Sequence, residues 1–152
     1  MSIIGESIRN IAVIGHSGEG KTTLCEAMLF NGGAVDRQGK VADGTTVTDF
    51  DELEKSKKMS IYTACAYLHW KGTKINLLDL PGFYDFEGER HEGLRAASGA
   101  LLVIGANGVL PIGAESVVDY CLRLGKPLII FINGMDKENA DYFGTVRALK
   151  EK

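Results

Sequence analysis

The sequence predicts an α/β fold in which a mostly parallel sheet lies between two layers of helices. Strand and helix patterns alternate along almost the whole chain. Two apolar runs, Ala100 to Ile104 and Pro127 to Ile132, have the continuous hydrophobicity of strands that are covered on both faces. Only one pair of strands is joined by a turn short enough for an antiparallel hairpin, so the other strands need helical crossovers. A three-layer α/β/α domain satisfies all three observations.

The first half of the chain is expected to contain a strand, a helix, a long loop and an antiparallel edge hairpin. The strands are placed over Arg9 to Ile14, Ile61 to Trp70 and Thr73 to Asp79, and the helix over Lys21 to Asn31. Lys71 and Gly72 fit a tight turn between the second and third strands. Residues 34–60 are polar and show no sustained period, which indicates a long irregular loop of the functional kind.

The second half is expected to alternate helix and strand. Helices are placed over Phe86 to Ala97, Gly113 to Leu124 and Ala140 to Lys150, with the two apolar strands between them. Both of these strands are predicted to be buried. In an open α/β sheet of this kind, the functional loops gather at the carboxyl ends of the strands.

Composition indicates one ordinary globular domain over residues 1–152, with 45% hydrophobic and 24% charged residues and a net charge of −3. That charge provides no global attraction to nucleic acid or anionic lipid, so we expect no sequence-specific DNA partner and no membrane partner. We also expect the fragment to be a monomer. Residues 1–7 lack the pattern of a secretory signal. Three widely spaced cysteines predict buried apolar side chains in a reducing compartment, and the expected location is therefore cytoplasmic.

The most informative motif is a glycine-rich segment at residues 15–23, between the first strand and the first helix. It has the pattern G-x-x-x-x-G-K-T, which cradles phosphates in its backbone amides at the positive end of the helix dipole. Lys21 is expected to reach the β- and γ-phosphates, and the Thr22 hydroxyl to bind Mg²⁺. The alternative is a glycine-rich strand-to-helix turn that matches by chance. The sequence therefore predicts binding of a nucleoside triphosphate, or descent from a protein that bound one.

Two further motifs follow strand ends. Asp79 at the end of a hairpin strand is placed to hold a metal-bound water, and the Gly82 N–H to sense the γ-phosphate. Asn133 and Asp136 suit guanine, because a carboxylate accepts the N1 and N2 protons that adenine lacks. The alternatives are a common turn at Asp79 to Gly82 and an Asx turn at Asn133 to Asp136.

Taken in order, these motifs resemble the GTP-binding (G) domain of translational GTPases, elongation factor G most closely. The resemblance includes the segment from Gly44 to Ser60 as a first switch and Asp79 to Gly82 as a second. It implies a P-loop NTPase fold and a GTPase that binds GTP or GDP with Mg²⁺, acts on the ribosome and changes shape on hydrolysis. The residues that it places at the nucleotide are Ser17, Gly18, Glu19, Gly20, Lys21, Thr22, Thr23, Asn133 and Asp136, with Thr22, Ser60 and Asp79 at the metal.

The chain departs from the family pattern at several positions. Phe83 occupies the place of the His that positions the attacking water, and Gly134 the place of a Lys that covers the base. Ser60 stands where the family usually has Thr. The fifth family motif, after a sixth strand, is missing, which indicates a fragment that ends before its last strand and its downstream domains. These departures leave alternatives open: a nucleotide-binding or ribosome-interaction module with little or no turnover, a scaffold without nucleotide, or an ATPase.

Overall fold

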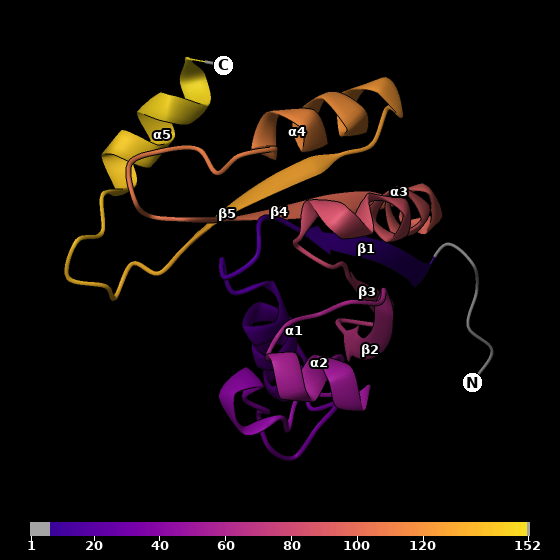
Figure 1. Cartoon of the computed structure of the whole chain (residues 1–152). Coiled ribbons are helices and arrows are strands. Elements are labelled where there is room, and N and C mark those ends of the chain that lie inside the picture. Colours follow the sequence, from indigo (N-terminus) through magenta and orange to yellow (C-terminus); the bar gives the residue numbers. More distant parts are fainter. Residues whose placement is uncertain (1–6, 152) are drawn as a thin grey trace.

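The computed structural model describes residues 7–151, so most of the N-terminal segment used to predict the location lies outside the described residues. Figure 1 shows the alternation of strands and helices along the chain. The strands are β1 (Ile8–Ile14), β2 (Ala64–Trp70), β3 (Thr73–Asp79), β4 (Gly99–Gly105) and β5 (Leu128–Asn133). The helices are α1 (Lys21–Asn31), α2 (Glu52–Lys57), α3 (Glu87–Ala96), α4 (Ala114–Arg123) and α5 (Tyr142–Lys150). Short 3₁₀ turns occupy Val41–Asp43 and Tyr84–Phe86.

The strands form one sheet in the order β2-β3-β1-β4-β5. β1 pairs in parallel with both β3 and β4, and β4 pairs in parallel with β5. β2 is the antiparallel edge strand, and the residues Trp70 and Thr73 pair directly across the turn that joins it to β3. The predicted mostly parallel sheet with one antiparallel edge hairpin is therefore confirmed.

Helices pack on both faces of the sheet. In the view of Figure 1, α1 lies below the strands, α4 lies above them, α3 crosses in front of β4 and β1, and α2 lies lowest, away from the strands. The alternation of side chains along β1 explains the two cores. Ala12 and Ile14 join a cluster with Leu94 of α3 and Val117 of α4. Val13 points to the opposite face and joins Leu29 of α1. This packing fixes the position of the glycine-rich segment, because that segment joins β1 to α1.

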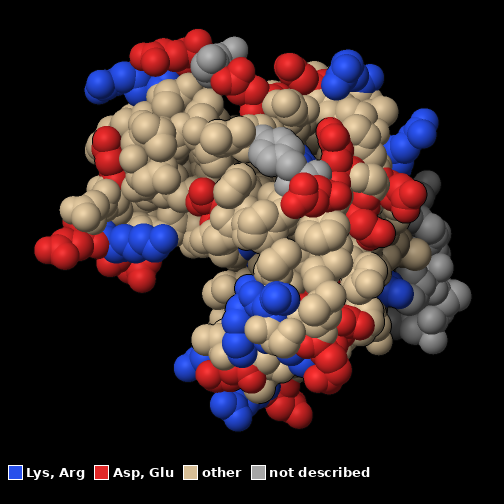
Figure 2. Space-filling view, viewed as in Figure 1, with Lys and Arg blue, Asp and Glu red and all other residues tan. Residues whose placement is uncertain are grey.

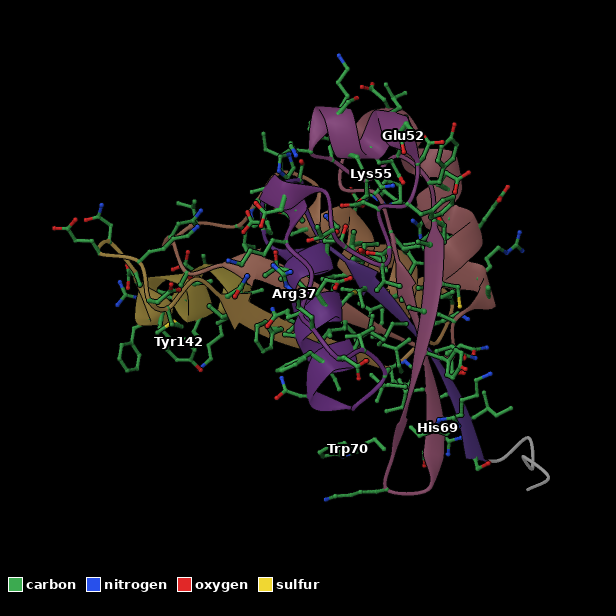
Figure 3. All side chains as sticks on the ribbon, turned by 90° about the horizontal axis from the view of Figure 1, so that it is seen from below. Arg37, Glu52, Lys55, His69, Trp70 and Tyr142 are labelled. Carbon is green, nitrogen blue, oxygen red and sulfur yellow. The ribbon has the colours of Figure 1, made fainter. Side chains whose placement is uncertain are left out.

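The structure corrects the expectation of an irregular loop over residues 34–60. Residues 52–57 form α2, and Asp51 begins it with a capping box: the Asp51 carboxylate accepts from the Leu53 amide at 2.8 Å, and the Glu54 carboxylate accepts from the Asp51 amide at 3.1 Å. A helix this short shows no hydrophobic period, but its cap was readable from the sequence. Figure 3 shows α2, with Glu52 and Lys55, at the opposite end of the β2–β3 hairpin from His69 and Trp70.

Two predictions of burial are wrong. β5 was predicted to be a buried strand, yet Ile129 is 68% exposed and Phe131 is 39% exposed. Within residues 7–151, no strand pairs with the outer edge of β5. Cys25 and Cys121 are buried as predicted, whereas Cys65 is exposed because it lies on the outward face of the edge strand β2. All three cysteines are free thiols.

None of the helices within residues 7–151 combines the length and hydrophobicity needed to cross a lipid bilayer.

Candidate functional site

The glycine-rich segment forms a loop that joins the end of β1 to the first turn of α1. Gly18 and Gly20 have φ values of +81° and +90°, a backbone conformation that favours glycine. Gly20 is the N-cap of α1 and provides no side-chain cap, so the first amides of the helix face the space above the loop. This arrangement of amides at a helix N-terminus binds anions.

Lys21 lies at the bottom of this loop. Its side chain is only 6% exposed, and its Nζ donates a hydrogen bond to the His16 carbonyl at 3.0 Å. Burial lowers the pKa of the Lys21 ammonium, while the nearby Asp79 carboxylate opposes that shift. A buried ammonium with a backbone carbonyl as its hydrogen-bond acceptor gains most from an anionic ligand, which phosphate would provide.

Polar side chains from four segments meet beside Lys21. The hydroxyls of Thr22 and Ser60 are 3.1 Å apart, although the two residues are far apart in the chain. Ser60 donates to Asp49 Oδ1 at 2.7 Å, and Thr48 donates to Asp79 Oδ2 at 2.8 Å. These contacts join α1, the segment before α2, the segment after α2, and the end of β3. The cluster is therefore a product of the tertiary fold.

The two carboxylates of this cluster are buried and only partly satisfied. Asp49 is 3% exposed and Asp79 is 1% exposed. Asp49 Oδ2 and Asp79 Oδ1 have no hydrogen-bond partner among the described residues. Burial raises the pKa of Asp79 to about 6, against the opposing effect of the Thr22 and Thr48 hydroxyls and of Lys21. Burial also raises the pKa of Asp49, although its bond from Ser60 opposes the shift. Two buried carboxylates, each with one oxygen that lacks a partner among the described residues, lie beside three hydroxyls and form an oxygen-rich site that suits Mg²⁺.

A pocket of about 200 Å³ lies above the loop. The glycine-rich loop and the start of α1 form its floor, and the segments on either side of α2 form one wall. The residues that line it are Ser17, Gly18, Gly20, Lys21, Thr22, Thr23, Val41, Asp49, Lys58, Met59 and Ser60. The residues predicted to hold phosphate therefore share one pocket with Ser60, which was predicted to hold metal. Glu19 contributes through its backbone, described below.

Gly82 lies directly against the loop. A β-carbon on Gly82 would stand 2.5 Å from both Lys21 Nζ and the Ser17 amide nitrogen, so only glycine fits. Phe83 follows it and is half-buried. His91 is farther along, where it stacks on Tyr120 of α4 with ring centroids 4.4 Å apart and lies 3.5 Å from Glu87. The imidazole of His91 is therefore engaged between α3 and α4.

The end of β5 reaches the glycine-rich loop through one side chain. Asn133 Nδ2 donates a hydrogen bond to the Glu19 carbonyl at 2.8 Å. This bond ties the loop after β5 to the glycine-rich loop. Asp136 is exposed. Gly134 has a φ of +75°, and the Lys137 side chain lies against it, with Cε 3.2 Å from where a β-carbon would stand. Figure 2 shows the molecule hollowed between the part that carries β5 and the part that carries α1 and α2.

Sequence reasoning missed Thr48 and Asp49. Both are buried in the cluster of hydroxyl and carboxylate groups beside Lys21, and both come from the loop in which no regular pattern was visible. The one available signal was the concentration of hydroxyl and carboxyl side chains in Thr45 to Asp49, interrupted only by Val47, in a segment assigned to the first switch. Their roles depend on tertiary contacts with Asp79 and Ser60, which a linear pattern does not specify.

Comparisons with known proteins agree with this geometry. Residues 6–152 match the family model described as the elongation factor Tu GTP binding domain. The chain is 42% identical over 144 residues to an elongation factor G-like protein of Mycobacterium tuberculosis, covering 95% of this chain and 20% of that protein. It is 38% identical over 146 residues to elongation factor G 2 of Streptomyces coelicolor, covering 96% of this chain and 21% of that protein. A crystal structure from Thermus thermophilus matches with a TM-score of 0.90 and 37% identity, covering 97% of this chain and 22% of that one. The chain thus spans about a fifth of the length of these relatives.

Proposed function

The chain belongs to the family of elongation factor Tu GTP-binding domains, and we propose that it is the GTP- and GDP-binding switch of a ribosome-associated translation factor of the cytoplasm. In this proposal the chain is the G domain of a longer protein that hydrolyses GTP in the presence of Mg²⁺. The observation that supports it most directly is the meeting of Lys21, Thr22, Ser60 and Asp79 in one buried site. These residues come from the glycine-rich loop, both switch segments and α1.

The triphosphate would lie in the pocket above the glycine-rich loop. The amides of Ser17 to Gly20 and the first turn of α1 would donate to its oxygens, and the helix dipole would add a positive potential. Lys21 would provide the charge, because the hydrogen-bond acceptor of its buried ammonium is a backbone carbonyl at 3.0 Å. Phosphate oxygens are stronger acceptors than a carbonyl.

The donor set around Thr22 fits Mg²⁺. Hydroxyl oxygens of Thr22 and Ser60 would bind the ion, with Asp79 holding a metal-bound water, and the unpartnered Asp49 oxygen belongs to the same cluster. Mg²⁺ prefers oxygen ligands and keeps several waters, so two hydroxyls and nearby carboxylates suit it. When bound, the ion would neutralise charge on the β- and γ-phosphates. The protein's own part is to hold these oxygens in place and exclude bulk water.

Base recognition would come from the loop that follows β5. The Asp136 carboxylate is exposed and available to accept the N1 and N2 protons of guanine. Asn133 would keep this loop in register with the phosphates through its bond to Glu19. A site built on those two protons disfavours ATP, because adenine would leave the carboxylate unmatched.

A second candidate is a nucleotide-binding or ribosome-interaction module with little or no turnover. Phe83 favours it, since a phenyl ring neither donates nor accepts a hydrogen bond to water. Gly82 still lies against the loop where its N–H would meet a γ-phosphate, so the sensing function is compatible with both candidates. Phosphate release from GTP, measured with and without ribosomes, separates them: turnover above the uncatalysed rate supports the GTPase, and its absence supports the binding module.

The proposed function is tested by calorimetric titration of the chain with GTP, GDP and ATP in Mg²⁺. We expect binding of both guanine nucleotides and at least ~100-fold weaker binding of ATP. Adenine would cover the Asp136 carboxylate without donating to it, which lowers the binding free energy by about 3 kcal/mol. Lys21→Ala should remove most triphosphate affinity, since a phosphate charge loses its main partner. Asp136→Asn should shift preference from guanine towards xanthine nucleotides.

Two results would contradict this assignment. Unchanged affinity in Lys21→Ala would show that the glycine-rich loop is not the phosphate site. Equal GTP affinity in Asp136→Asn would show that Asp136 does not read the base. Lys126→Ala is a suitable control for the loss of a positive charge, because this lysine bonds carbonyls of Arg95 and Ala97 away from the pocket.

A further inference from the structure

Glu26 is a fully buried carboxylate in the second turn of α1, one helical turn after Thr22. Its Oε2 accepts a hydrogen bond from the Gly39 amide at 2.9 Å, and its Oε1 accepts one from the Val47 amide at 2.6 Å. Both amides belong to the loop between α1 and α2. One side chain therefore fixes two points of this loop, eight residues apart, to the helix that begins with Lys21.

The loop between these two points is folded on itself. The amides of Asp43 and Thr45 both donate to the Lys40 carbonyl, at 3.1 and 3.2 Å, around the 3₁₀ turn Val41–Asp43. Gly39 is held tightly at its base: a β-carbon there would stand 2.6 Å from Glu26 Oε2 and 2.5 Å from the Thr45 carbonyl oxygen. Residues 39–47 thus form a small closed unit with Glu26 as its attachment to α1.

This unit ends where the candidate metal site begins. Val47, whose amide is bound by Glu26, is followed directly by Thr48 and Asp49, and these side chains bond Asp79 and Ser60. Thr22, on the other side of the same site, is on the helix that carries Glu26. Glu26 therefore sets the position of one wall of the site relative to the other, although it lines neither.

We propose that Glu26 is a positioning residue that holds residues 39–49, which include the start of the first switch, in place for the binding of Mg²⁺ with nucleotide. The proposal rests on the function proposed above and deepens it. A loop of this length has a conformational entropy that binding would otherwise have to overcome. By ordering the loop before ligand arrives, Glu26 raises the fraction of molecules in which Thr48 and Asp49 are ready beside Asp79.

The test is Glu26→Gln, which keeps the size of the side chain. Its carbonyl oxygen still accepts from one amide, but its NH₂ group faces the other amide as a second donor. Glu92→Gln, at an exposed position of α3, is the matched control for the same change of charge. Gly39→Ala is a second variant that acts from the loop side and leaves α1 intact.

Two measurements decide the outcome. Hydrogen–deuterium exchange of the ligand-free chain should increase across residues 39–49 in Glu26→Gln and Gly39→Ala and stay unchanged in Glu92→Gln. The Mg²⁺ concentration for half-maximal GTP binding should rise about tenfold in the first two variants, the size expected for one unmatched buried amide. Nucleotide affinity measured in EDTA should stay within about twofold of wild type, because the glycine-rich loop is untouched.

Unchanged exchange in Glu26→Gln would overturn the anchor itself. Faster exchange with an unchanged Mg²⁺ requirement would show that Glu26 stabilises the loop without positioning the site, which also contradicts the proposal. If the wild-type chain bound no guanine nucleotide, the proposed function would fail, whereas the exchange comparison would still decide whether Glu26 anchors the loop.

Discussion

Burial changes the acid–base chemistry of single residues at the centre of the candidate site. The pKa of Asp79 is raised and that of Lys21 is lowered, so both groups are less readily ionised than in water. Perturbed titrating groups of this kind concentrate at functional sites. The ligand-free fold tolerates this destabilisation, and a cation and a phosphate would restore full pairing to both groups. At Asp79, the cost to folding stability and the proposed benefit to metal binding can both be measured.

We expect Asp79→Asn to stabilise the metal-free chain at pH 7.5 and to have little effect at pH 4. The folded-state pKa is about 6, above the value of about 4 for an unfolded aspartate, so the folded state holds the proton more tightly. Stability therefore falls as pH rises between these values, and the full penalty, roughly 3 kcal/mol, is present above pH 6. Asparagine cannot ionise and avoids it. Urea unfolding in EDTA at both pH values measures the difference.

The control for this prediction is Asp119→Asn, at an exposed position of α4. An equal change of unfolding free energy at both pH values in Asp79→Asn would contradict a raised pKa. The same variant should bind Mg²⁺-nucleotide more weakly, so stability and binding should move in opposite directions.

At this scale the sequence pointed to candidate site residues that belong to a contiguous motif. Lys21 and Thr22 follow the glycine-rich loop, and Asp79 ends β3 with Gly82 three residues later. The structure brings these residues close together, and their roles in binding stay predictions. Thr48 and Asp49 were missed because their partners are distant in the chain. The contact of the Lys137 side chain with Gly134 was likewise unpredictable, since it depends on the turn geometry after β5.

Elements with a strong local pattern match their predictions closely. α1 has the predicted bounds, Lys21–Asn31, because Gly20 begins it and two glycines follow it. α2 was missed because six residues give no periodicity, although its capping box is local chemistry. The β2–β3 hairpin was predicted from two strand patterns and the turn at Lys71 and Gly72, although β2 begins at Ala64 and not at Ile61. The turn holds a lysine in the left-handed region of backbone space.

We expect Lys71→Asn to raise the free energy of unfolding by about 0.5 kcal/mol. Lys71 and Gly72 have φ values of +47° and +80°, the left-handed pair of a type I′ turn. A lysine is strained there by its β-carbon, whereas asparagine adopts this region more readily. Gly72→Ala is the opposite change and should lower stability by about 1 kcal/mol. Urea denaturation measures both variants, and a lower stability of Lys71→Asn than of wild type would contradict the turn assignment.

At the scale of the whole molecule, burial decreases from the centre of the sheet towards β5. β5 was predicted to be buried because its side chains are hydrophobic. The exposure of a strand also depends on the elements that surround it. β4 lies between β1 and β5, whereas β5 has a partner strand on one side only among the described strands. Val103 of β4 is fully buried, and its paired residue Phe131 of β5 is 39% exposed. Hydrophobicity alone therefore predicted the strand but not its surroundings.

This gradient predicts different costs for the same kind of substitution. Val103→Thr places a hydroxyl in the core beside α1 and should lower the unfolding free energy by about 2 kcal/mol. Ile129→Thr changes a side chain that is 68% exposed and should alter it by less than about 0.5 kcal/mol. Both substitutions replace a β-branched residue by threonine, so strand propensity is nearly constant between them.

Urea unfolding of both variants at two protein concentrations measures these costs, and sedimentation tests whether the chain is the expected monomer. A cost for Ile129→Thr as large as that for Val103→Thr would mean that the outer face of β5 is covered in solution, and a concentration-dependent cost would identify a second copy of the chain as the cover.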